Sequence, residues 1–338
     1  MNKNWIDLLI KSGASESIQN FGDPASEISA VAGETVVSPR VDVGLIQAVG
    51  EDAESFLHNL LTNDIKGLSP DGVQRAGFCT PKGRLLADFL VWREADGLFL
   101  QLSADILPGI LKKLSMYVLR SKAKLADATA EHIVIGLSGP NADTLLEEIG
   151  AIPPAPMRTV HFPAGTVIGL AEHRFQLVIR GTEVAAVWQQ LCARARPVGV
   201  AAWQWLDIAA GIPHISLPTQ EQFVPQMINF ELIGGVGFKK GCYPGQEIVA
   251  RTEYLGKIKK RMVRARLAEG MVVVGDAVYA PETGEQACGS VVTTAPSPSG
   301  GTELLVVLPS SVAKAGEIHL RAPDGPRLSL LELPYQTD

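Results

Sequence analysis

The amino-acid sequence predicts an α+β fold that ends in a small β-barrel. Between residues 35 and 210, stretches with the two-residue alternation of strands are interspersed with stretches that have the helical spacing of apolar residues. After residue 258, only short strand-like stretches occur, and Gly-rich turns separate them at intervals of about ten residues, a pattern typical of a small barrel. A chain of 338 residues is long enough for two or three domains with a large core.

The elements are expected in an order that suggests three regions. Strands are expected within 35–49, 72–103 (a meander), 123–128, 132–137, 167–170 and 175–180, and helices at 51–61, 104–120 (kinked near Pro108), 139–149, 183–194 and 200–210. The predicted domains are a loosely held N-terminal arm at 1–30, two α/β subdomains at 31–255 with a break near 150–158, and the barrel at 256–338. His58 falls off the apolar face of its helix and is expected at the surface.

Composition and cysteine usage restrict the class of protein. Hydrophobic residues make up 46% and charged residues 20%, which is typical of a globular protein. The four cysteines are far apart, so no self-contained metal or cluster site is expected, and their sparse use suits a reducing compartment. No apolar run is long enough for a signal peptide or a membrane span. The expected location is therefore cytoplasmic, without a membrane partner.

Charge is unevenly distributed along the chain. The formal net charge is −6, yet residues 239–266 contain nine Lys or Arg and two Glu. This region is either a surface that attracts anions such as phosphates, carboxylates or nucleic acid, or an exposed pair of strands with solvated lysines.

The stretch 234–251, GGVGFKKGCYPGQEIVAR, carries the densest chemistry. Its glycines and the Pro-Gly pair predict a sharp loop around Cys242, and a helix is expected from Gln246. Lys239 and Lys240 before the thiol, and the helix start after it, favour a thiolate, which is the nucleophilic form. The alternative is a small buried residue in a tight turn.

Two other positions stand out. Asp88 lies in the apolar strand LLADFLVW, where a charge needs a partner or a function unless the strand is at an edge and Asp88 faces water. Trp203 and Trp205 precede the Gly-Ile-Pro stop of a helix, and Trp203 either stacks on a planar heterocycle or packs in the core.

Four segments resemble the YgfZ family, folate-binding proteins related to the glycine-cleavage T-protein. They are GEDAESFLHNLLTNDI, WQWLDIAAGIP, QFVPQMIN and, most specifically, KGCYPGQE, and the resemblance extends from about residue 35 to 330. It implies a T-protein-like fold, with interwoven α/β folate-binding subdomains around a central cavity and a C-terminal β-barrel. It also implies tetrahydrofolate or a derivative as cofactor.

The resemblance also implies roles for individual residues. Trp203 matches a folate-site tryptophan, Asp88 matches the T-protein aspartate that faces the reactive end of folate, and Ala209 stands where relatives often place a pterin-binding glutamate. Lys239, Lys240 and Arg251 would bind an anionic tail. The remaining residues that match the cofactor-binding motif are Gly241, Tyr243, Gly245, Gln246 and Glu247.

Three functions are compatible with these features. The first is an accessory protein of iron–sulfur cluster assembly or repair, and not a classical enzyme. It would support iron–sulfur enzymes, including tRNA-modifying ones, through Cys242 and a transient cluster shared with a partner. The second is a folate-dependent aminomethyl or one-carbon transferase that uses Asp88 as its acid–base group. The third, an RNA-binding module, is disfavoured because the basic region contains few aromatic residues.

Overall fold

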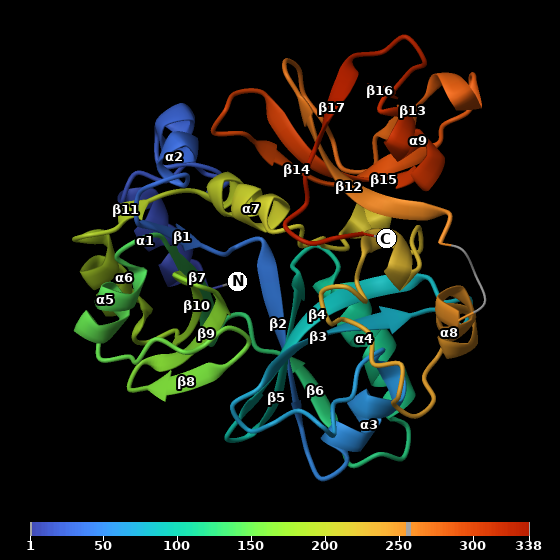
Figure 1. Ribbon diagram of the computed structural model, residues 1–338. Helices are drawn as coiled ribbons and strands as arrows, with labels where there is room; N and C mark the ends of the chain where they lie inside the picture. Colours follow the sequence, from blue (N-terminus) through green and yellow to red (C-terminus); the bar gives the residue numbers. More distant parts are fainter. Residues whose placement is uncertain (1, 255–257, 338) are drawn as a thin grey trace. The chain divides into compact units, whose positions relative to one another are not determined.

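The computed structural model describes residues 2–254 and 258–337 (Figure 1). The chain divides into two compact units. Unit 1 comprises residues 1–56, 66–74 and 90–203, and unit 2 comprises residues 57–65, 75–89 and 204–338. The chain therefore passes between the units five times. The predicted break near 150–158 does not coincide with a limit of either unit, and the predicted boundary between residues 255 and 256 lies outside the described residues.

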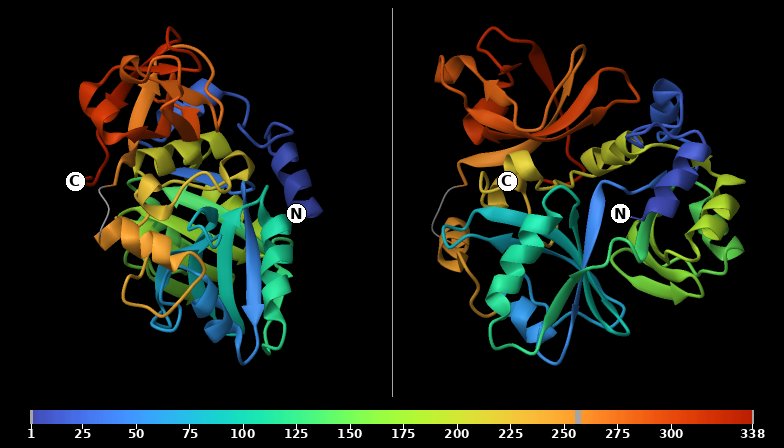
Figure 2. Two further views of the ribbon diagram at one scale, coloured as in Figure 1. Left: turned by 90° about the vertical axis from the view of Figure 1, so that its right-hand side faces the viewer. Right: turned by 180° about the vertical axis from the view of Figure 1, so that it is seen from behind.

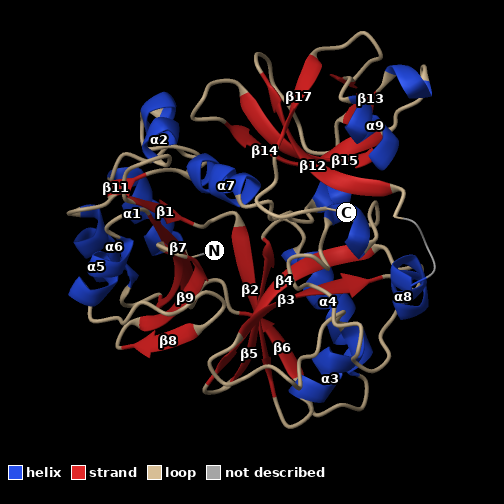
Figure 3. Cartoon of the chain, in the orientation of Figure 1, coloured by secondary structure: helices blue, strands red, loops and turns tan. Residues whose placement is uncertain are grey.

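Unit 1 holds most of the described helices, one complete sheet and part of a second; helices and strands are coloured in Figure 3. Its helices are α1 (Lys3–Lys11), α2 (Pro24–Ala30), α4 (Leu107–Val118), α5 (Ala142–Glu148) and α6 (Val184–Cys192). Its strands are β1 (Val36–Pro39), β2 (Val43–Val49), β5 (Gly97–Ser103), β6 (Lys124–Asp127), β7 (His132–Ser138), β8 (Thr159–Phe162), β9 (Gly165–Ala171), β10 (Arg174–Arg180) and β11 (Arg196–Pro197).

A six-stranded sheet with the order β11-β1-β7-β10-β9-β8 forms one half of unit 1. Its core includes side chains from β7, β10, α5 and α6, and Trp5 and Leu9 of α1 are buried within it. The Trp5 ring meets the Trp188 ring edge-on at a centroid distance of 5.3 Å. The prediction of a loosely held segment before residue 30 is therefore wrong for α1, because an amphipathic helix buries its apolar face wherever a core is available.

A second, five-stranded sheet has the order β3-β4-β5-β2-β6; its strands β2, β5 and β6 lie in unit 1, where α4 packs on β2 and β6. The predicted kink at Pro108 is absent from α4, because the helix begins at Leu107 and the proline lies in its first turn. A proline there removes no helical hydrogen bond.

Four elements run from one unit into the other: α3 (Ala53–Leu60), β3 (Val73–Cys79), β4 (Leu85–Glu94) and α7 (Val200–Ala209).

Unit 2 contains a closed barrel with the strand order β12-β15-β14-β13-β16-β17, in orange and red in Figures 1 and 2. The strands are β12 (Lys260–Leu267), β13 (Ala277–Tyr279), β14 (Gly289–Pro296), β15 (Thr302–Pro309), β16 (Ile318–Leu320) and β17 (Arg327–Leu331). The other elements are α8 (Gln246–Tyr254), α9 (Ser310–Ala315) and the 3-10 helices η1 (Leu217–Thr219), η2 (Pro225–Ile228) and η3 (Pro281–Thr283).

The interior of the barrel is filled by aliphatic side chains from alternate strand positions, among them Leu304, Val306 and Leu308 of β15. Pairing of β12 with β17 closes the ring of strands. The predicted α+β fold with a C-terminal β-barrel is thus confirmed, although β17 was not expected.

Candidate functional site

The loop that carries Cys242 is attached to the segment that follows α3. The Thr62 hydroxyl donates to the Gly235 carbonyl at 2.6 Å, and the Gly237 amide donates to the Thr62 carbonyl at 2.9 Å. The Asn63 side chain donates to the Gly234 carbonyl at 2.7 Å. Because these partners are about 170 residues apart in sequence, tertiary contacts and not local propensity determine the path of the loop.

Lys240 attaches the same loop to the end of α3. Its ammonium donates to the carbonyls of His58 and Leu61, the latter at 2.6 Å, and lies 5.0 Å from the centre of the Tyr243 ring. Carbonyls at a helix C-terminus have no partner within the helix, so a lysine satisfies them well. Burial lowers the pKa of Lys240 to about 8, although the charges of Asp64 and Cys242 oppose this shift. The sequence had suggested that Lys240 belongs to an exposed anion-binding surface. In the structure it instead points into the protein.

Gly245 allows the loop to approach the turn between β3 and β4. Its φ of +82° is in the left-handed region, and a Cβ there would lie 2.4 Å from the Thr80 carbonyl oxygen and 2.7 Å from Gly83. Only glycine satisfies both requirements without displacing the turn. The helix predicted after the loop is confirmed as α8, which begins at Gln246.

Cys242 is the exposed thiol of the chain. Cys79 and Cys288 are buried and Cys192 is partly buried, and all four, which lie within the described residues, are free thiols. Burial raises the pKa of Cys79 and of Cys192 to about 12, and it also raises the pKa of Cys288. The alternative that Cys242 is a small buried residue in a turn is therefore wrong.

The other motif residues divide into exposed and inward-facing groups. Lys239, Gly241, Glu247 and Arg251 are exposed, Tyr243 is buried, and Gly245 and Gln246 are half-buried. The basic region is less open than its composition suggests, because Arg261 pairs with Glu231 and Arg264 pairs with Glu303 inside unit 2. Lys257, which the sequence counted in this region, lies outside the described residues.

His58 was expected at the surface, but its side chain is only 12% exposed, and its Nδ1 lies 3.1 Å from Asp64 Oδ1. The reason is that the Cys242 loop passes over this end of α3, where Lys240 binds the His58 carbonyl.

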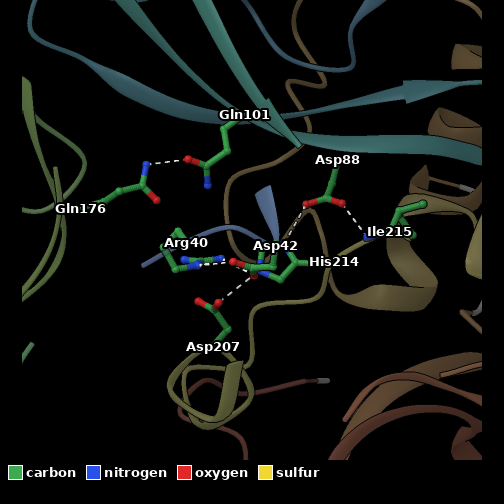
Figure 4. A network of polar contacts seen from close by, with 8 residues as sticks. All are labelled: Arg40, Asp42, Asp88, Gln101, Gln176, Asp207, His214 and Ile215. Atoms are coloured by element: carbon green, nitrogen blue, oxygen red, sulfur yellow. Dashed lines mark hydrogen bonds and ion pairs between the residues drawn. The ribbon is translucent and has the colours of Figure 1, made fainter. Parts of the chain in front are cut away.

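A second polar cluster in unit 2 surrounds Asp88 (Figure 4). The backbone amide of Ile215 donates to Asp88 Oδ1 at 2.6 Å, and His214 Nδ1 lies 3.3 Å from Asp88 Oδ2. The other ring nitrogen of His214, Nε2, lies 3.3 Å from Asp207 Oδ2. Asp88 is 5% exposed and β4 is flanked by β3 and β5, so the alternative of an edge-strand aspartate that faces water is wrong.

His214 links the two carboxylates. Burial alone would lower the pKa of His214, but its contacts with Asp207 and Asp88, together with their negative charges, outweigh it and raise this pKa to about 9. The imidazole is therefore protonated at neutral pH. His214 was not among the predicted site residues; the available signal was a histidine directly after the Gly-Ile-Pro stop of a helix that also carries Asp207.

Trp203 lies in unit 1 and is fully buried. Its ring covers Gly136 of β7, where a Cβ would come within 2.3 Å of the indole. The guanidinium carbons of Arg174 and Arg40 lie 4.9 and 5.4 Å from the ring centre. The core-packing alternative thus describes the ring in this structure, and the predicted role of Trp203 in folate binding stays a prediction.

Buried amide groups occur in the same part of unit 1. The Gln176 side chain donates to the Gln101 side chain at 2.6 Å (Figure 4), and Gln176 is the cross-strand partner of Gly136. Gln176 Oε1 and the Trp203 indole N–H have no hydrogen-bond partner among the described residues. Buried polar atoms of this kind are normally satisfied, so an acceptor and a donor are available there for a polar ligand.

The sequence pattern of one family, the GCVT N-terminal domain, matches residues 16–233. A tRNA-modifying protein YgfZ from Edwardsiella ictaluri is 29% identical over 310 residues, which are 87% of this chain and 90% of that protein. One from Vibrio vulnificus is 31% identical over 231 residues, 68% of this chain and 70% of that protein.

Among solved structures, the crystal structure of glycine cleavage system aminomethyltransferase T from Bartonella henselae matches 99% of this chain and 97% of its own, with a TM-score of 0.80. At 17% sequence identity, this match shows a shared fold, the T-protein fold expected from the sequence. Together with the sequence matches, it leads to one conclusion: the chain belongs to the family of the GCVT N-terminal domain and, within it, to the YgfZ proteins.

Proposed function

We propose that this protein is a folate-binding accessory factor that supports the assembly or repair of iron–sulfur clusters, and that it acts through Cys242. The observation that carries the proposal is the contrast among the thiols: Cys242 is exposed on a loop that several contacts hold in place, whereas burial raises the pKa values of the other three. An accessible thiol on a fixed loop can meet a partner protein, and thiolates are the usual ligands of iron–sulfur clusters.

A cluster at Cys242 would be shared with another molecule. Iron–sulfur clusters take about four protein ligands, and the described residues contain no group of three or more His, Cys, Asp or Glu that could hold a metal ion. The proposed partners are therefore iron–sulfur enzymes or cluster-assembly proteins that supply the remaining ligands. tRNA-modifying enzymes are the favoured class, because the relatives are named tRNA-modifying proteins. None of the described helices has the length and apolarity needed to cross a membrane.

Folate binding is proposed from the family and from the polar atoms of unit 1. A pterin is a planar ring with donors and acceptors along its edge. The indole N–H of Trp203 and Gln176 Oε1 are a donor and an acceptor without partners among the described residues, so they fit such a ring chemically. A bound folate would supply a one-carbon carrier, while this chain's residues would bind and orient its ring.

A second candidate function is a folate-dependent aminomethyl or one-carbon transferase. The observation that favours it is the buried carboxylate of Asp88, which is held by Ile215 and His214. By the sequence resemblance, Asp88 corresponds to the T-protein aspartate. Such a carboxylate is suited to stabilise positive charge on a substrate nitrogen or to accept a proton from it.

Complementation separates the two functions. A strain that lacks its own YgfZ protein would receive the wild-type chain, Cys242→Ser or Asp88→Asn, and the activity of an iron–sulfur enzyme would be measured. We expect Cys242→Ser to lose most of the supporting activity, because serine is a far weaker acid and a poor iron ligand, and Asp88→Asn to retain most of it.

Cys192→Ser is the matched control, because it removes a thiol that is partly buried, and it should support normal activity at equal protein level. The opposite ranking of Cys242→Ser and Asp88→Asn would favour the transferase. Loss in both variants would mean that the thiol and the carboxylate act in one process.

A further inference from the structure

His214 is positioned by elements that lie far from it in sequence. The segment that carries it begins at Gly211, which follows the end of α7 and has a φ of +66°. The Tyr335 hydroxyl donates to the Gly211 carbonyl at 2.7 Å, and a Cβ on Gly211 would collide with the Tyr335 ring. This contact and the hydrogen bond from the Ile215 amide to Asp88 hold the two ends of a five-residue segment, with His214 between them.

The groups that face the His214 ring in unit 2 are carboxylates from two different elements. Asp88 comes from β4 and lies at Nδ1, and Asp207 comes from α7 and lies at Nε2, each at 3.3 Å. Both nitrogens of a protonated imidazole are donors, so one ring can bind both carboxylates at once. A neutral imidazole has a single donor and would leave one carboxylate without it.

We propose that His214 is the positioning residue of Asp88: its ring, hydrogen-bonded to Asp88 through Nδ1 and ion-paired with Asp207 through Nε2, holds the Asp88 carboxylate oriented to accept an N–H group of a folate-class ligand. A carboxylate that is 5% exposed needs polar partners, because an unpartnered polar group is costly to bury. Each carboxylate oxygen accepts more than one hydrogen bond, so the contacts with Ile215 and His214 leave Asp88 able to bind a ligand. The raised pKa of His214 is consistent with this arrangement.

The inference rests on the folate part of the proposed function and does not involve Cys242. It assigns a role to a residue outside the motifs of the chain. It also explains why two acidic residues from separate elements are buried around one ring: Asp207 orients His214, and His214 orients Asp88.

A matched pair of substitutions separates positioning from simple support of the segment. Asparagine can place its amide nitrogen where Nδ1 lies and keep the donor to Asp88, whereas glutamine can place its amide nitrogen where Nε2 lies and keep the donor to Asp207. The full-length wild type, His214→Asn and His214→Gln would be compared for tetrahydrofolate affinity by calorimetry and for thermal unfolding.

We expect His214→Gln to weaken tetrahydrofolate binding about tenfold, the usual cost of a lost charge-assisted hydrogen bond, and His214→Asn to stay within about threefold of wild type. Thermal midpoints should fall similarly in both variants, because each loses one of two contacts. Equal affinity losses in the two variants, or no loss in either, would overturn the positioning role.

A second measurement needs no ligand. The ¹⁵N NMR signals of the His214 ring should remain those of an imidazolium at pH 7.5 in the wild type, and the titration midpoint should fall by about one unit or more in Asp88→Asn. A midpoint that Asp88→Asn leaves unchanged would overturn the proposal. If the wild type binds no tetrahydrofolate while this midpoint does fall, the folate part of the proposed function fails and the Asp88–His214 coupling stands.

Discussion

Cys242 and Asp88 belong to the same unit but have opposite surroundings. Cys242 is exposed on a loop, and the contacts that hold the loop come from its neighbours, chiefly Lys240 and Gly245. Asp88 is buried in a strand that lies between two others. Its carboxylate oxygens themselves accept hydrogen bonds, from His214 and from the Ile215 amide. A thiol can be presented to another molecule with little preparation, whereas a buried carboxylate needs partners to stay ionised. The first position therefore suits contact with a partner protein, and the second suits a desolvated ligand.

The largest expected effect concerns thiol reactivity. At neutral pH, limiting iodoacetamide should label Cys242 at least about a hundredfold faster than Cys79, Cys192 or Cys288, because burial both shields those thiols and raises their pKa values. Mass spectrometry of the peptides after timed labelling gives the four rates. Labelling in denaturant, where all four should react at similar rates, is the control. Earlier modification of any buried thiol would contradict the description of the loop.

The next effect concerns what holds the loop. Lys240→Met removes the hydrogen bonds to the carbonyls at the end of α3 and should lower the free energy of unfolding by about 1–3 kcal/mol. Lys239→Met is the matched control, because Lys239 is the adjacent lysine and is exposed. This substitution should change the free energy of unfolding by less than about 0.5 kcal/mol. Denaturant titrations of both variants measure the difference. Equal effects would show that the Lys240 contacts add nothing to stability.

The smallest effect concerns pH and the Asp88 cluster. The folded-state pKa of His214 is raised to about 9 from an ordinary value of 6.5. The resulting stability is fully present below about pH 6.5 and is lost as the pH rises through 9. The difference in unfolding free energy between wild type and His214→Asn should therefore shrink by about 1 kcal/mol per pH unit between pH 6.5 and 9.5. A constant difference across this range would mean that His214 is neutral in the folded protein.

Local patterns in the sequence predicted the parts of the fold that local physics determines. The turn-forming glycines and Pro-Gly around Cys242 predicted a loop followed by a helix, and α8 begins at Gln246 as expected. Short apolar stretches between glycine turns predicted the barrel, but β17 was missed because Arg327–Leu331 has only five residues, and only one of them is buried. Pro108 was misinterpreted because a proline has different effects at the start and in the middle of a helix.

The polar partners were harder to predict, because they come from distant parts of the chain. The hydrogen bond between Ile215 and Asp88 joins residues 127 positions apart, and that between Lys240 and Leu61 joins residues 179 apart. A pair of adjacent lysines in a loop normally indicates a charged surface, and only tertiary structure shows that the second points inward. His214 was overlooked for the same reason: its significance comes from Asp88 and Asp207, and neither is adjacent to it.

The pairing of β1 has a consequence for synthesis of the chain. β1 pairs with β7 on one side and, through Val36 and Val37, with Arg196 and Pro197 of β11 on the other. At a translation rate of about 5–20 residues per second, roughly 8–30 s separate the synthesis of β1 from that of β11. During that interval β1 has an unpaired edge, the kind of surface on which nascent chains associate wrongly. Completion of the six-stranded sheet therefore waits until about 200 residues have been synthesised, because β11 ends at Pro197.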